Sequence, residues 1–209
     1  MLKEGYAMHM PSPNTVAPAQ GLYQPDEFKD NCGFGLIAHM KGESSHHLVE
    51  TAIHSLSCMT HRGGIAADGK TGDGCGLLLA MPKAFFREEA KKLSDITLSE
   101  VFAVGTVFLN LDPAIAAHAK QILAKEIESE GLKVLAWRVV PTNVAALGEI
   151  ALRSMPAFEQ IIVNCPMGVT EVEFNRKLFL ARRRAEQLLI NDSSFYVTTL
   201  CSTVISYKG

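Results

Sequence analysis

The sequence changes character at residues 30–38, DNCGFGLIA, where Cys32 precedes the first apolar run of the chain. Residues 1–31 hold four of the nine prolines and almost no periodic apolar pattern, so we interpret them as an extended leader. No continuous apolar segment follows the positively charged start of this leader, which argues against a secretory signal peptide. The sequence therefore predicts a folded domain over residues 32–209, preceded by a leader.

Cys32 is the residue that we expect to carry the chemistry of the chain. If the bond between Asn31 and Cys32 were cut, Cys32 would hold both a thiol and a free α-amine, whose ordinary pKa is about 8. One residue would then supply a nucleophile and a general base. Gly33 and Gly35 would let the backbone approach a ligand closely. Position alone leaves open the alternative that Cys32 is a small buried hydrophobe.

From Gly33 onward, strand-like and helix-like patterns alternate. Apolar runs predict strands at residues 34–38, 77–81, 101–110, 133–140, 157–164, 195–200 and 202–208, the last two as a pair. Helical periodicity predicts helices at residues 47–60, 83–93, 112–130 and 171–190. Pro113 opens and Gly131 closes the third of these helices. The expected buried stripe of the first helix is Ala52, Ile53, Leu56 and Met59. This mixture indicates an α/β or α+β domain.

The composition is that of an ordinary globular protein, with 209 residues, 47% hydrophobic and 20% charged, and a formal net charge of −2 at pH 7. Because acidic and basic side chains nearly balance, the protein has no net positive potential that would attract nucleic acid. We expect Arg182-Arg183-Arg184 to form a solvated helix face. The longest apolar run, residues 101–109, is too short to span a membrane. Five cysteines at irregular spacing indicate reduced thiols and a cytoplasmic protein.

Three motifs follow one another in the first half of the chain. They are CGFGLIA at residues 32–38, MTHRGG at residues 59–64 and TGDG at residues 71–74, the last of which precedes an apolar strand. In this order they resemble the glutaminase domain of the glutamate synthase large chain family, which is a class II glutamine amidotransferase domain. Residues 207–209, YKG, resemble another segment of that domain, and between about Pro82 and this segment the likeness is one of pattern.

The resemblance implies an α+β fold of the N-terminal nucleophile hydrolase type, a four-layer αββα sandwich that is incomplete in this chain. It also implies that residues 1–31 are a propeptide, whose removal makes Cys32 the N-terminal residue. The Cys32 thiolate would then attack the side-chain amide of L-glutamine, and the resulting γ-glutamyl thioester would be hydrolysed to glutamate. Arg62 and Gly63 fall on the Arg-Gly pair of the family, and we expect them to line the substrate pocket beside Cys32.

We expect structural roles for two other residues in and beside the motifs. Asp73, between two glycines, is expected to fix a tight turn rather than to contact the substrate, because Asp and Gly are common turn formers. Cys75 is expected to be a packed thiol. The family's oxyanion hole uses an Asn-Gly pair, and no Asn-Gly dipeptide occurs in this sequence. We therefore expect the domain to continue beyond Gly209, with the oxyanion and glutamine-carboxylate residues there, and the isolated chain to lack glutaminase activity.

In the complete protein, the resemblance implies that downstream synthase domains of the same chain use the ammonia to make glutamate from 2-oxoglutarate. Those later domains are expected to hold FMN and an iron–sulfur cluster, and a small electron-transfer subunit is a candidate partner. Within the present segment, no cofactor and no metal are expected. Neither nucleic acid nor a membrane is expected as a partner.

Two other classes of protein stay open. A small zinc-binding domain is one of them, because histidines and cysteines gather around the first predicted helix with a spacing that a zinc site can use. These residues are His46, His47, His54, Cys58, His61 and Cys75. No Cys-x-x-Cys pair accompanies them, which weakens the alternative. The other alternative is a non-catalytic α/β binding module in which Cys32 is inert and the leader is retained.

Overall fold

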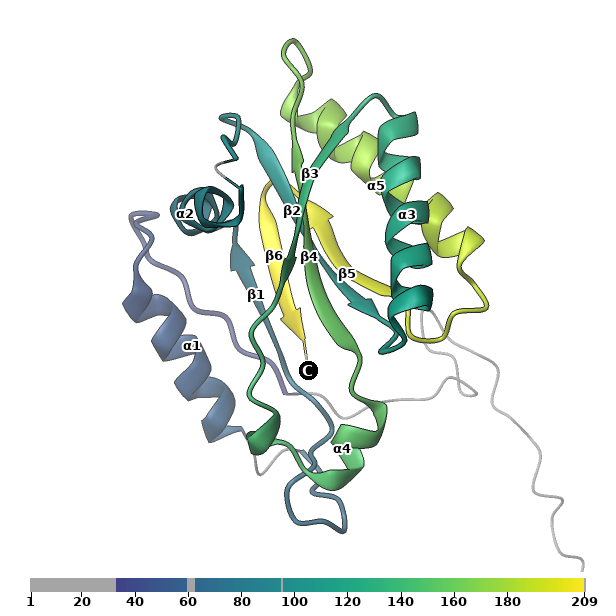
Figure 1. Cartoon of the computed structure of the whole chain (residues 1–209). Coiled ribbons are helices and arrows are strands. Elements are labelled where there is room, and N and C mark those ends of the chain that lie inside the picture. The colour runs from purple at the N-terminus through teal and green to yellow at the C-terminus, as the bar shows by residue number, and fades with distance from the viewer. Residues whose placement is uncertain (1–32, 60–62, 95, 209) are drawn as a thin grey trace, which may run out of the picture. The chain divides into compact units, whose positions relative to one another are not determined.

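The computed structural model describes residues 33–59, 63–94 and 96–208 (Figure 1). It divides the chain into two units, Met1–Phe34 and Gly35–Gly209, and every helix and strand named below belongs to the second unit. The helices are α1 (His46–Cys58), α2 (Lys83–Ser94), α3 (Pro113–Ser129), α4 (Glu149–Ser154) and α5 (Glu171–Leu188), with a short 3-10 helix η2 (Val144–Ala146). The strands are β1 (Gly76–Ala80), β2 (Phe102–Leu109), β3 (Lys133–Val139), β4 (Ala157–Asn164), β5 (Tyr196–Cys201) and β6 (Val204–Lys208).

An antiparallel four-stranded sheet with the order β3-β4-β2-β5 forms the centre of the second unit (Figure 1). β2 and β4 are the inner strands and pair over their full lengths, from Phe102↔Asn164 to Leu109↔Ala157. All residues of β2 except Phe108 are buried. A strand that is buried on both of its faces requires a covering layer on each side of the sheet.

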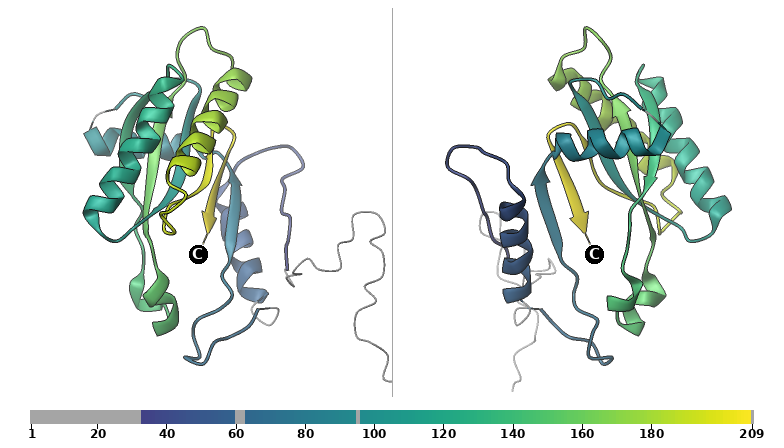
Figure 2. Two further views of the ribbon diagram at one scale, coloured as in Figure 1. Left: turned by 90° about the vertical axis from the view of Figure 1, so that its right-hand side faces the viewer. Right: turned by 60° about the vertical axis from the view of Figure 1, so that its left-hand side comes forward.

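Helices α3 and α5 cover one face of this sheet (Figure 2). Their buried residues recur at helical spacing, so that each helix turns one apolar stripe toward the strands. These residues are Ala119, Leu123, Ile127, Phe174, Leu178, Ala181 and Ala185. The packing leaves no room for a side chain at Gly105 of β2, where a Cβ would lie 2.7 Å from Leu200 Cδ1 and 3.1 Å from Ile161 Cγ2.

Helix α3 begins and ends with the residues that the sequence predicts. The carboxylate of Asp112 accepts hydrogen bonds from the backbone N–H groups of Ala114 at 2.8 Å and Ile115 at 3.3 Å, and Pro113 occupies the first turn. Gly131 follows the last turn with a φ of +74°, the left-handed conformation in which many helices terminate. Both ends are therefore set by local side-chain and backbone chemistry.

A second layer covers the other face of the four-stranded sheet. β1 and β6 form a separate two-stranded antiparallel sheet, in register from Gly76↔Lys208 to Ala80↔Val204. With α2, they bury an apolar cluster against β2 and β4. The cluster consists of Met81, Phe86, Ala90, Leu98, Phe102, Val104, Ile162 and Ile205. Antiparallel sheets with helices packed against them make this an α+β arrangement, as the sequence predicts.

A polar network crosses this second layer. The fully buried Gln160 of β4 accepts a hydrogen bond from Arg138 Nη1 at 3.1 Å and donates one to the Tyr207 hydroxyl at 3.4 Å. Arg138 also forms an ion pair with Glu89 of α2 at 2.7 Å. The charge-assisted hydrogen bonds of Arg138 thus join β3, β4 and α2, and the neutral bond between Gln160 and Tyr207 adds β6.

Two predicted strand features are wrong. Residues 34–38 form no strand, and Phe34 and Leu36 are 91% and 89% exposed, because no described strand pairs with this apolar run. β5 and β6 do not pair with each other either. The chain bends at Ser202 and Thr203, so that β5 joins the four-stranded sheet and β6 pairs with β1.

The helical predictions need two corrections. Ile53 of α1 is 55% exposed, whereas Ala52, Leu56 and Met59 are half-buried. Successive residues lie about 100° apart around a helix, so Ile53 points away from the face that these three share. The prediction also missed η2 and α4, which are too short to show helical periodicity. The arginine triplet agrees with its prediction, since Arg183 and Arg184 of α5 are exposed and Arg182 is half-buried.

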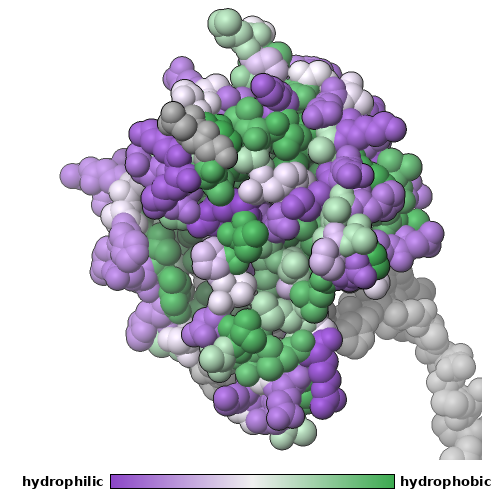
Figure 3. All heavy atoms as spheres, viewed as in Figure 1, coloured by the Kyte–Doolittle hydropathy of each residue, from purple (hydrophilic) through white to green (hydrophobic). Residues whose placement is uncertain are grey.

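Apolar and polar side chains are interspersed on the face shown in Figure 3, and an apolar area lies where Figure 1 places α4. Two of the exposed apolar residues of α4 are Ile150 and Leu152. Across the described ranges, none of the helices has the length and the apolar character needed to cross a bilayer.

Candidate active site

The structure describes one of the three predicted site residues. Cys32 and Arg62 lie outside the described residues. Gly63 is described, and it is exposed in a bend at the start of the connection between α1 and β1. We call residues 63–75 the glycine loop. For the predicted site, the structure therefore gives the contacts that hold the glycine loop in place.

The glycine loop folds back on itself as a small hairpin. Ile65 and Gly72 form an isolated antiparallel bridge, and the Ala66 N–H donates to the Thr71 carbonyl at 2.8 Å. At the tip, the Gly69 N–H donates to the Ala66 carbonyl at 3.0 Å. Gly69 has a φ of +69°, which glycine adopts without the steric cost that a side chain would bring. The two legs of the loop are thus tied together by backbone hydrogen bonds.

Asp73 closes the base of the hairpin. Its Oδ2 accepts a hydrogen bond from the Gly64 N–H at 2.7 Å. Gly74, the next residue, has a φ of +91° and turns the chain toward β1. Asp73 therefore has a structural contact, as the sequence suggests, although this contact reaches across the loop rather than closing a local turn.

Asp68 ties the tip of the hairpin to α4. One carboxylate oxygen, Oδ1, accepts hydrogen bonds from the N–H groups of Lys70 at 3.0 Å and Thr71 at 2.8 Å. The other, Oδ2, accepts from the Thr71 hydroxyl at 2.6 Å and from the Ile150 N–H at 3.1 Å. The Thr71 hydroxyl oxygen accepts in turn from the Ala151 N–H at 3.2 Å. Two N–H groups in the first turn of α4, which the helix itself cannot satisfy, are thus satisfied by the loop.

Gly148 makes this contact sterically feasible. It is the N-cap residue of α4 and has no side chain with which to cap the helix, so Asp68 and Thr71 do so from the loop. A Cβ at Gly148 would overlap Asp68 Oδ2 and Thr71 Oγ1. The hydrogen bonds to Asp68, first those from Thr71 and then those from Lys70 and Ile150, hold the pKa of this carboxyl well below its usual range.

The sequence motifs assign no role to Asp68, and Thr71 enters them only as the first residue of TGDG. Asp68-Gly69 is an ordinary turn signal, and an Asp side chain often bonds the backbone two or three residues later. That local half of the arrangement could have been found from the sequence. The other half could not, because Ile150 lies 82 positions from Asp68 and no local pattern connects them.

The residues of the zinc alternative do not converge in the part of the chain that the structure describes. On the exposed helix α1, His54 Nε2 lies 3.7 Å from Cys58 Sγ, and His46 Nδ1 lies 3.4 Å from Glu50 Oε1. Within residues 33–59, 63–94 and 96–208, no group of three or more His, Cys, Asp or Glu side chains is placed to hold a metal ion. His61 lies outside these ranges.

The described cysteines differ in their surroundings. Cys75 is exposed, so the prediction of a packed thiol is wrong, because the loop leaves it on the surface before β1 begins. Cys165 is half-buried, and burial, with a smaller contribution from Glu171, raises the pKa of its thiol. A raised pKa disfavours the thiolate form that a nucleophile needs. Cys165 is therefore a poor alternative to Cys32.

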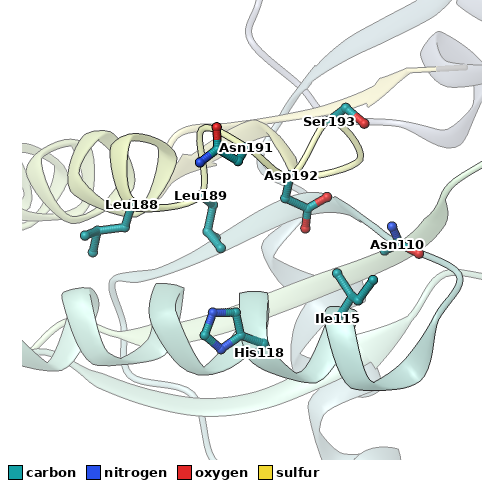
Figure 4. Close-up of a pocket in the computed structure, with 8 residues that line it drawn as sticks. All are labelled: Asn110, Ile115, His118, Leu188, Leu189, Asn191, Asp192 and Ser193. Carbon is teal, nitrogen blue, oxygen red and sulfur yellow. The ribbon is translucent and has the colours of Figure 1, made fainter.

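Two surface hollows lie among the described residues. The first, of about 360 Å³, lies between α3 and the end of α5, where Ile115 and His118 face Leu188, Leu189 and Asp192 (Figure 4). It contains no residue of the glycine loop. The second, of about 320 Å³, adjoins the loop tip. Its lining is Asp68, Lys70, Leu147, Gly148 and Glu149, which are the residues of the contact with α4 and their neighbours.

The motifs around Cys32 and the glycine loop belong to a known class of protein. Residues 32–209 match the family described as glutamine amidotransferases class-II. Since the match covers most of the chain, this chain belongs to the class II glutamine amidotransferases. The family predicted from the three motifs is confirmed.

Within this class, the chain is similar to glutamate synthases. It is 38% identical over 198 residues to the glutamate synthase (NADPH) large chain of Bacillus subtilis (strain 168), covering 94% of this chain and 13% of that protein. It is 39% identical over 195 residues to the corresponding protein of Azospirillum brasilense, with 90% and 12% covered. Ferredoxin-dependent glutamate synthase 2 of Synechocystis sp. is 38% identical over 200 residues, with 94% and 12% covered. The chain spans about an eighth of the length of these relatives.

Proposed function

We propose that this chain is part of the glutaminase domain of a glutamate synthase, and that the complete domain hydrolyses L-glutamine to glutamate and ammonia. The observation that carries the proposal is the family match over residues 32–209, which begins at the cysteine that we expect to be the nucleophile. Similarity to relatives named as an NADPH and a ferredoxin-dependent glutamate synthase supports the assignment of this glutaminase part to a glutamate synthase.

In the proposed reaction, the Cys32 thiolate attacks the carbon of the glutamine side-chain amide, and a tetrahedral oxyanion forms. The α-amine of Cys32 takes up the thiol proton and delivers it to the departing nitrogen, so that the C–N bond breaks and ammonia leaves. Water then attacks the γ-glutamyl thioester, which releases glutamate and restores the thiol. An amine with an ordinary pKa of about 8 can exchange protons in both directions near neutral pH.

Arg62 and Gly63 are proposed to line the glutamine pocket. A guanidinium can hold a carboxylate through paired N–H donors, and a glycine lets the substrate approach the backbone. The exposed position of Gly63 on the tethered glycine loop supports this role. The four-stranded sheet, the β1–β6 sheet and the helices on the α3–α5 side are compatible with part of a four-layer αββα sandwich, which we propose for the complete domain.

We also propose roles for the leader and for the domains that follow this chain. Residues 1–31 act as a propeptide that is removed to expose the Cys32 amine, and further domains use the ammonia to make glutamate from 2-oxoglutarate. FMN and an iron–sulfur cluster belong to those domains, with a small electron-transfer subunit as a candidate partner. The cytoplasm is the proposed location. Chain 1–209 alone is expected to lack glutaminase activity.

The test is the intact mass of the longest natural protein that carries this sequence, measured without chelator before and after treatment with an electrophilic glutamine analogue. We expect the polypeptide to start at Cys32 and to gain one analogue adduct there, and the C32A variant to gain none. A retained leader with an unreactive Cys32 would contradict the proposal. An added mass of zinc would favour the metal-binding alternative instead.

A further inference from the structure

We infer that Asp68 is a positioning residue of the glutaminase site, because it anchors the glycine loop that carries Gly63 to the first turn of α4. The inference rests on the proposed function, in which Gly63 lines the glutamine pocket. In this role, Asp68 makes no contact with the substrate and acts through the loop.

The anchor and Gly63 are connected by a continuous set of short contacts. Asp68 and Thr71 hold the loop tip against Ile150 and Ala151. The bridge at Ile65 and Gly72 joins the two legs of the hairpin. The carboxylate of Asp73 then fixes the Gly64 N–H, one residue from Gly63. A displacement of the tip is therefore transmitted to the base of the loop through backbone hydrogen bonds.

The loop needs such an anchor because its own composition disfavours order. Residues 61–76 include six glycines, and ordering a glycine costs more backbone entropy than ordering any other residue. The loop residues are mostly exposed, so apolar burial contributes little to holding them. Hydrogen bonds that the loop tip accepts from the N–H groups of α4 are then the main described contacts that fix the loop to the rest of the fold, and a fixed loop gives a preorganised pocket.

A carboxylate is required at position 68, and an amide would not replace it. Each of its two oxygens accepts two hydrogen bonds, with Lys70 and Thr71 N–H on Oδ1 and the Thr71 hydroxyl and Ile150 N–H on Oδ2. In Asp68→Asn, an NH₂ group replaces one oxygen. At the Oδ1 position it faces the N–H donors of Lys70 and Thr71, and at the Oδ2 position it faces the Ile150 N–H, while the Thr71 hydroxyl can turn and accept from it. The substitution keeps the volume of the side chain but breaks either the tip turn or the link to α4.

Thr71 offers a matched pair of substitutions. Thr71→Val removes the hydroxyl that donates to Asp68 and accepts from Ala151, while it keeps the branched shape. Thr71→Ser keeps the hydroxyl and is the rescuing variant. Asp112→Ala is the control, because it removes a carboxylate that also caps a helix through two backbone N–H groups, but on α3, which is no part of the loop contact.

The experiment uses the complete natural protein and measures kcat and KM for glutamine hydrolysis together with the thermal midpoint. D68N and T71V are expected to raise KM about tenfold or more, with a smaller effect on kcat, because a displaced pocket wall loses substrate orientation. T71S should stay close to the parent protein. D112A should lower the thermal midpoint and leave KM unchanged. Iodoacetamide should alkylate Cys32 at the parent rate in every variant, since the anchor does not act on the thiol.

The outcomes separate the two proposals. If the parent protein hydrolyses glutamine and D68N keeps the parent KM, the positioning role is overturned and the proposed function stands. A KM that rises equally in D68N and D112A would show a general loss of stability, which also overturns it. If the parent protein hydrolyses no glutamine and Cys32 takes up no glutamine analogue, the proposed function fails and this inference fails with it.

Discussion

The carboxylate of Asp73 accepts a hydrogen bond at 2.7 Å from the backbone N–H of Gly64, nine positions earlier in the chain. The approach is close enough that a Cβ on Gly64 would lie 3.2 Å from Asp73 Oδ1. Two of the motifs that identify the family are therefore joined by one hydrogen bond. The identities of both residues have a structural reason that needs no contact with substrate.

The first prediction concerns this bond. Asp73→Ala should lower the free energy of unfolding by about 1 kcal/mol, because an exposed hydrogen bond to a charged acceptor is lost. Asp73→Asn can still accept from the Gly64 N–H and should cost less than half as much. Urea unfolding of the chain, followed by circular dichroism, measures both. Equal losses in the two variants would show that the charge, rather than the hydrogen bond, holds the base of the loop.

The second prediction concerns pH. Hydrogen bonds from Thr71, Lys70 and Ile150 hold the pKa of Asp68 below the ordinary 3.8, so the folded state favours the carboxylate. Its contribution to stability is complete above that ordinary pKa and is lost as the pH falls toward the folded-state pKa. The difference in thermal midpoint between the parent chain and D68N should thus be constant between about pH 7 and about pH 5, and should shrink below about pH 4. A difference that grows on acidification would contradict the lowered pKa.

Features with a local cause could be predicted from the sequence. Asp112, Pro113 and Gly131 fix the ends of α3 through contacts within a few residues, and the predicted bounds of the strand at residues 157–164 agree with β4. β2 has no polar residue except Thr106 and is buried on both faces, so a continuous apolar run was a sufficient signal.

Features that depend on distant partners could not be predicted. The apolar run at residues 34–38 has the composition of a strand, but pairing decides whether a strand forms, and no described strand pairs with it. The separation of β5 from β6 depends on β1, which is more than 100 residues earlier. For the candidate site, motif resemblance pointed to Cys32, Arg62 and Gly63, whereas the anchor at Asp68 became visible only when α4 was placed beside it.

The third prediction concerns the room at Gly148. Gly148→Ala places a methyl group against Asp68 and Thr71, and should cost about 1–3 kcal/mol, as overpacking commonly does. Adding Asp68→Ala should cost less in this background than in the parent, since it removes one side of the clash. Gly35→Ala is the control, because a Cβ there meets nothing within 4 Å. Additive losses from the two substitutions, measured by urea unfolding, would count against the contact.

The fourth prediction concerns the polar network between the sheets. Arg138→Ala should lower the free energy of unfolding by about 2 kcal/mol, because it leaves the side-chain oxygen of the fully buried Gln160 without its donor. Glu89 keeps only its ion pair with Lys92. The matched control is Arg183→Ala, whose side chain is 63% exposed in its ion pair with Glu186, and which should cost less than about 1 kcal/mol. The same arginine-to-alanine change is thus compared in a buried and an exposed ion pair. Similar losses in the two variants, measured by urea unfolding, would mean that water reaches the network and that Arg138 does not hold the second layer on the four-stranded sheet.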